Sequence, residues 1–126
     1  LGFSLYPHHL KNKSECSLED FCVMIAKTAE IMGTDSIGFG SDLCQNQPDE
    51  VVEWMRNGKW TKSIDFGEGS QSEAGFPPQP KWFENNKGFA NILNGLRLVG
   101  FSSKEIKKIS GENWMNFFEK SFSSAI

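Results

Sequence analysis

Residues 36–42, with the sequence SIGFGSD, form the most informative segment of this chain. Ile37 and Phe39 alternate with small residues, a pattern that predicts a short strand whose backbone is approached closely by its neighbours. Asp42 follows directly after this strand, and ligands of barrels and doubly wound sheets bind at the carboxyl ends of their strands. Asp42 is therefore a candidate general base or proton shuttle. On spacing alone, a simpler role is favoured, in which Asp42 caps a turn.

A second strand and a helix precede this segment. Residues 2–6 alternate apolar with small residues and end at Pro7, which predicts another short strand. Ser17 is placed to cap a helix whose apolar residues recur at three- and four-residue steps until Gly33 stops it. The order strand, helix, strand predicts a right-handed crossover and a parallel pair of strands.

The composition changes after Asp42. Residues 43–81, called the excursion below, are rich in Gly, Ser, Gln, Glu and Pro. We expect one short helix at about 49–56 and no regular structure at the proline run 77–80. The excursion is therefore predicted to be an insertion of nearly forty residues.

Helical periodicity returns after the excursion. Three helices are predicted, the first ending at Gly100, the second capped by Ser102 or Ser103, and the third starting after Gly111. The chain also has four tryptophans, for which we expect places in the core rather than a ligand-stacking role. These are Trp54, Trp60, Trp82 and Trp114.

The net charge, the apolar runs and the cysteine count limit the classes of partner and location. The net charge is −3, and the 13 basic residues are scattered, which argues against a nucleic-acid partner. No apolar run reaches the length of a membrane span, and no secretory signal is visible at the start. The location is thus open, with the cytoplasm slightly favoured. Three cysteines without a C-x-x-C spacing predict reduced, structural thiols.

The predicted sheet is incomplete. Two parallel strands alone would leave both edges unpaired, whereas parallel sheets are larger and covered on both faces. The chain of 126 residues also opens at Leu1, inside an apolar strand-like run, as a truncated chain would. We therefore expect a single unit that forms part of a larger domain.

The two histidines, His8 and His9, are adjacent. Neighbouring side chains of an extended loop point in different directions, so one metal ion bound by both is not expected. Hydrogen-bonding or solvent-facing roles are the favoured interpretation.

Several segments together resemble the end of renal (membrane) dipeptidase sequences. They are residues 2–7, the helix after Ser17, residues 37–42 with the pattern G-x-G-S-D, and residues 100–114 with GFSSKEIKKI followed by G-E-N-W. The resemblance covers most of the chain in the right order. It implies an α/β fold, the C-terminal portion of a (β/α)8 TIM-type barrel, with the last two βα units, the excursion at 43–81 and C-terminal helices.

The same resemblance implies a zinc metallodipeptidase that hydrolyses dipeptides with metal-activated water. The family's two zinc ions are held by residues upstream of the matched region, so no metal ligand is assigned in this chain. Asp42 aligns with the family's catalytic acid/base. Tyr6, His8 and His9 would lie next to the dipeptide substrate, although they match no catalytic motif.

The chain departs from the commoner family pattern after Asp42. In the commoner form the strand continues as Asp-Phe-Asp-Gly. Here Asp42 is followed by Leu43, Cys44 and Gln45, so the second acid of the motif is missing. The excursion suggests a lid or a subunit contact. Two alternatives to a hydrolase fragment are a non-catalytic interaction module and a homodimer that completes the sheet with a second copy in place of the missing N-terminal half of the barrel. In isolation we expect the chain to be inactive.

Overall fold

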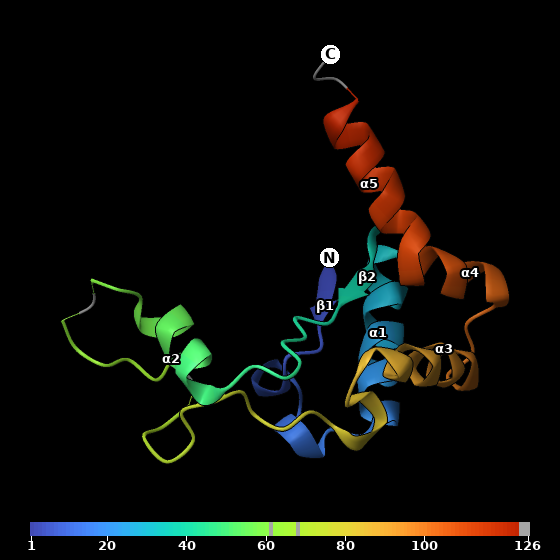
Figure 1. Cartoon of the computed structure of the whole chain (residues 1–126). Coiled ribbons are helices and arrows are strands. Elements are labelled where there is room, and N and C mark those ends of the chain that lie inside the picture. The colour runs from blue at the N-terminus through green and yellow to red at the C-terminus, as the bar shows by residue number, and fades with distance from the viewer. Residues whose placement is uncertain (61, 68, 124–126) are drawn as a thin grey trace.

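The computed structural model describes residues 1–60, 62–67 and 69–123 (Figure 1). Its sheet consists of strands β1 (Gly2–Ser4) and β2 (Gly38–Gly40), which pair in parallel with Gly2 opposite Gly38. The Leu5 amide continues the ladder by donating to the Gly40 carbonyl at 3.0 Å. The parallel pair is confirmed, and both strands are shorter than predicted.

Helix α1 (Leu18–Met32) connects the two strands, as the sequence predicts. The Ser17 hydroxyl caps it by accepting a hydrogen bond from the Asp20 amide at 3.0 Å. Gly33 ends the helix at a φ of 75°, a backbone conformation that favours glycine. The helix buries Phe21 and Ile25 against the strands and the later helices.

Helix α3 (Phe89–Leu98) packs against α1, and the residue of α3 at this contact is a glycine, Gly95. A Cβ added to Gly95 would lie only 2.6 Å from the Cys22 sulfur and 3.0 Å from Leu18 Cγ. The glycine thus allows the two helices to approach closely. Helix α4 (Ser103–Lys107) follows, with a complete capping box between Ser102 and Glu105.

The predicted break at Gly111 is wrong. The chain continues from α4 through a π-helical segment, Lys108–Glu112, directly into α5 (Asn113–Phe122). Ile109 is fully buried in this segment, and the Asn113 side-chain amide donates to the carbonyls of Thr34 and Ile37, at 2.7 Å each. These tertiary contacts keep the chain helical through Gly111, whose φ is not positive.

The strands and helices α1, α3 and α4, together called the body below, share one hydrophobic core. Its fully buried members include Leu5, Phe21, Ile25, Ile37, Phe83, Ile92, Leu96 and Ile109. Trp82 and Trp114 are half-buried against this body, whereas Trp54 is 64% and Trp60 86% exposed. A core position is therefore wrong for these last two tryptophans, because the excursion that carries them does not fold back over the core (Figure 1).

The excursion extends away from the body, as the green and yellow segments of Figure 1 show. It contains helix α2 (Asp49–Asn57), close to the predicted range, and the proline run 77–80 lies in neither a helix nor a strand. Val52 is the residue of α2 that is buried. Across the described ranges, no helix has both the length and the apolar character required to cross a membrane.

Candidate functional site

Tyr6 and Asp42 occupy equivalent places on the two strands. Tyr6 lies two residues beyond the end of β1, and Asp42 lies two residues beyond the end of β2. Since the strands are parallel and Ser4 stands opposite Gly40, both residues emerge at the same, carboxyl end of the sheet. The pairing therefore places two of the predicted site residues at the same end of the sheet.

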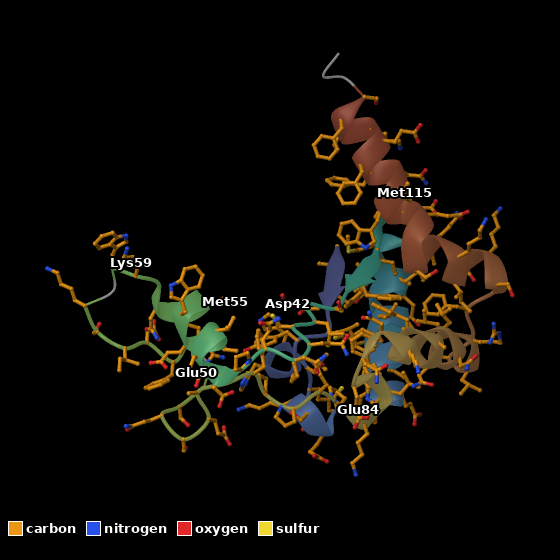
Figure 2. All side chains as sticks on the ribbon, in the orientation of Figure 1. Asp42, Glu50, Met55, Lys59, Glu84 and Met115 are labelled. Carbon is orange, nitrogen blue, oxygen red and sulfur yellow. The ribbon has the colours of Figure 1, made fainter. Side chains whose placement is uncertain are left out.

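Asp42 is exposed where the chain leaves β2 toward α2 (Figure 2). Its φ of 48° is left-handed, a conformation that aspartate tolerates better than most residues. The side-chain hydrogen bond of this turn comes from Ser41, whose hydroxyl accepts from the Leu43 amide at 3.3 Å. Ser41 thus makes the turn contact for which Asp42 was the candidate, and the Asp42 carboxylate faces solvent.

Tyr6 is the centre of an aromatic group at this end of the sheet. Its ring lies 5.0 Å from the His9 ring and 5.5 Å from the His8 ring, between centroids. Phe76, from the excursion, meets Tyr6 edge-on at 6.2 Å. The three predicted substrate neighbours therefore lie together, and the excursion contributes a fourth ring.

The histidine loop differs from the expected extended form. Pro7–His9 forms a 3-10 turn, and the Leu10 amide closes it by donating to the Pro7 carbonyl at 3.0 Å. His9 Nδ1 lies 2.9 Å from the Ser4 hydroxyl, which also accepts from the Tyr6 amide at 3.1 Å. The turn directs both imidazoles toward Tyr6, because it curls the backbone where an extended loop would send them apart.

Arg56 joins this group and is missed by the sequence analysis. Its guanidinium lies 3.4 Å from the Tyr6 hydroxyl, and it donates to the Ala74 carbonyl at 2.9 Å. The contact with Tyr6 spans fifty residues of sequence. No local spacing pattern could reveal it, since the excursion carries no periodicity that relates α2 to the start of the chain.

A hollow of about 450 Å³ separates the histidine loop from the excursion. Its lining carries both signs of charge, with Lys13 in the turn Lys13–Glu15 that follows the histidines and Asp49 and Glu73 on the excursion. His8 and Phe76 complete its wall near Tyr6. The hollow thus presents basic and acidic side chains from two segments that are far apart in the sequence.

The described residues do not form a metal site of their own. Across the ranges that the structure covers, no group of three or more His, Cys, Asp or Glu side chains could hold a metal ion. Cys16 and Cys22 are buried, Cys44 is half-buried, and all three are free thiols. His8 and His9 belong to no such group of ligands within these ranges, and zinc sites usually need at least three protein ligands.

The fold has a counterpart among solved structures. The chain superimposes on an amidohydrolase from Pseudomonas aeruginosa with a TM-score of 0.80 and 22% sequence identity. The match covers 97% of this chain but 36% of the amidohydrolase chain, so this chain spans about a third of that length. No protein-family model matches the chain, and the curated proteins contain no match. The chain therefore has the fold of part of an amidohydrolase.

Proposed function

We propose that this chain is the C-terminal part of a (β/α)8-barrel hydrolase of the renal dipeptidase type, in which Asp42 moves protons during hydrolysis of dipeptides. One observation carries the proposal: Tyr6 and Asp42 leave the same end of an in-register parallel strand pair. Active sites of such barrels lie at this end. The likeness to part of an amidohydrolase adds support at the level of the fold.

The incomplete sheet is consistent with this proposal. β1 pairs with β2 on one side, and within the described residues its other side has no strand partner. An open edge of a parallel sheet is covered by further strands in stable α/β proteins. The rest of the barrel would supply those strands.

Zinc, which the dipeptidase resemblance implies, does not fit the residues that the structure describes. The described part contains no cluster of ligands that could hold it. In this proposal the two zinc ions are bound by residues outside the chain. Asp42 is not a zinc ligand, and its role is the transfer of a proton. The Asp42 carboxylate takes a proton from the attacking water as its oxygen bonds to the peptide carbon. It then gives that proton to the amine nitrogen as the C–N bond breaks.

The test is Asp42→Asn in the full-length protein. An amide cannot accept and return the proton, so kcat for dipeptides is expected to fall by about 10²- to 10⁴-fold. The zinc content should stay at the wild-type level, because Asp42 is not proposed as a ligand.

Asp65→Asn is the matched control, since Asp65 is also an exposed acid beyond β2, accepting a hydrogen bond from the Gly67 amide. Its kcat should stay at the wild-type value. A near-normal kcat for Asp42→Asn would show that another group moves the proton.

A self-associating module is the second candidate, favoured by the apolar surface of α5. Phe117 is 57% and Phe122 68% exposed, and the helix projects beyond the body (Figure 1). Exposed apolar surface of this kind marks an interface. A second copy could cover it and extend the sheet edge.

Sedimentation equilibrium of the 126-residue chain separates the two candidates. A self-associating module gives a dimer that Phe122→Glu weakens, with a melting temperature that rises with protein concentration. A concentration-independent monomer would count against this candidate.

A further inference from the structure

From the contacts of Arg56 we infer that this residue is a positioning residue, which holds the excursion against Tyr6 and thereby fixes one wall of the substrate site. This role rests on the proposed dipeptide hydrolysis. Arg56 belongs to α2, outside the strand ends, and nothing assigns it to the chemistry itself. Its importance follows from what it joins.

Arg56 first closes the excursion on itself. Nη1 donates to the Ala74 carbonyl at 2.9 Å, and Nη2 lies 3.4 Å from the Gly75 carbonyl. These acceptors are eighteen and nineteen residues further along the chain. A single planar guanidinium thus ties α2 to the returning, irregular segment of the excursion.

The excursion is shaped to admit this side chain. A Cβ at Gly69 would stand 3.0 Å from Arg56 Nη1 and 2.5 Å from the Glu73 carbonyl oxygen. The Ser70 and Glu73 backbones pair across this tight turn. A larger residue at position 69 would therefore displace either the turn or the guanidinium.

Arg56 then connects the folded excursion to the site. Nη2 lies 3.4 Å from the Tyr6 hydroxyl, and Phe76, next to the Gly75 acceptor, packs edge-on against the Tyr6 ring. A further link is made by the Ser14 hydroxyl, which donates to the Pro78 carbonyl at 2.5 Å. Tyr6 in turn contacts both histidines, so this junction places the excursion beside the whole aromatic group.

The acceptors around Arg56 are neutral. They are two backbone carbonyls and a phenol, and no carboxylate pairs with Arg56 among residues 1–60, 62–67 and 69–123. Its role is therefore set by the geometry of its fork more than by its charge. A lysine keeps the charge but offers one ammonium, which cannot reach acceptors on two sides.

The experiment compares Arg56→Lys and Arg56→Ala in the full-length protein. Both variants are expected to raise KM for dipeptides about tenfold or more while changing kcat less than about threefold, because a displaced wall weakens binding without removing a reacting group. Failure of lysine to rescue alanine is the signature of a geometric role. Amide hydrogen exchange of residues 70–76 should also become faster, with the amides of α1 unchanged.

Lys59→Ala is the control within the same excursion. Lys59 is exposed near its tip and stacks on Trp60 at 5.3 Å from the ring centroid (Figure 2). Loss of this lysine should leave KM and the exchange of residues 70–76 at their wild-type values. Tyr6→Phe removes the hydroxyl alone and should reproduce part of the rise in KM.

The outcomes separate this inference from the proposed function. Unchanged exchange in both Arg56 variants overturns the positioning role, whatever the activity. Faster exchange with an unchanged KM overturns it too, because the excursion then forms no part of the substrate site. A wild-type protein that hydrolyses no dipeptide overturns the proposed function instead, and the exchange measurement still decides whether Arg56 holds the excursion.

Discussion

The indole of Trp114 lies so close to Gly38 that a Cβ built at Gly38 would stand 2.6 Å from its Nε1 atom. A Cβ at Gly2, the partner of Gly38 in the sheet, would stand 3.0 Å from the same indole. Nε1 also lies 3.2 Å from the Phe39 carbonyl oxygen, to which it donates. The start of α5 is therefore seated directly on the backbone of both strands, which explains why both strands begin with glycine.

Gly38→Ala is expected to destabilise the fold by about 1 to 3 kcal/mol, the usual cost of forcing extra atoms into a packed site. The new methyl group would have to displace the indole and break its bond to Phe39. Urea denaturation measures the change. Gly40→Ala is the control, since a Cβ at Gly40 would have no described atom within 4 Å apart from Gly40 and its two chain neighbours. Equal stabilities for the two variants would contradict the seating of Trp114 on β2.

Glycine-to-alanine changes in the helices should have opposite signs at two positions. Gly95→Ala places a methyl group 2.6 Å from the Cys22 sulfur and should separate α3 from α1, at a cost of about 1 to 3 kcal/mol. Gly111→Ala meets no neighbour and should stabilise the helical path by about 0.5 to 1 kcal/mol. Thermal unfolding of both variants tests the pair. A stabilising Gly95→Ala would show that the two helices are not in close contact.

The elements of the body could be predicted because their signals are local. Ser17 and Gly33 mark the ends of α1, and Ser102 marks the start of α4, through hydrogen bonds within a few residues of sequence. The parallel pairing also followed, since a helical crossover between two short strands permits little else. The continuous path through Gly111 could not be predicted, because it depends on the contacts of Asn113 with residues far away in sequence.

The candidate site could be predicted only in part. Tyr6 and Asp42 emerge at the same end of the sheet through strand register, which the sequence pattern contains. Arg56 and Phe76 join Tyr6 through a long irregular segment whose path no periodicity describes. The prediction that Trp54 and Trp60 are buried was wrong for a related reason, since an aromatic residue is buried only where the backbone returns to the core.

The capping box of α4 should contribute to stability in a pH-dependent manner. Hydrogen bonds from the Ser102 hydroxyl and amide lower the pKa of Glu105 below its ordinary value of 4.5. Because the folded-state pKa is the lower one, this stabilisation is present above pH 4.5 and is lost as the pH falls through the folded-state pKa. Glu105→Gln should therefore lose less stability than the wild type between pH 6 and pH 3.

Urea denaturation at a series of pH values measures this difference. Glu30→Gln, at an exposed position on α1, serves as the control and should follow the wild-type pH dependence. Parallel curves for Glu105→Gln and the wild type would show that the capping box is absent in solution.

Thiol labelling should distinguish the three cysteines and report on the contact between α1 and α3. Burial raises the pKa of the Cys22 thiol to about 11, and burial also raises the pKa of Cys16. At pH 8 only about one Cys22 in a thousand is then the reactive thiolate, even before access is considered. Cys22 has no exposed surface and faces the Ile92 carbonyl of α3, so a reagent reaches it only when the helices separate. The half-buried Cys44 lies outside this core and should react first. With Ellman's reagent we expect one fast and two slow phases, and Cys44→Ser should remove the fast phase.

Gly95→Ala should accelerate the slowest phase, because it weakens the packing that excludes the reagent. Labelling of Cys22 at the rate of Cys44 would mean that α1 and α3 are not packed together.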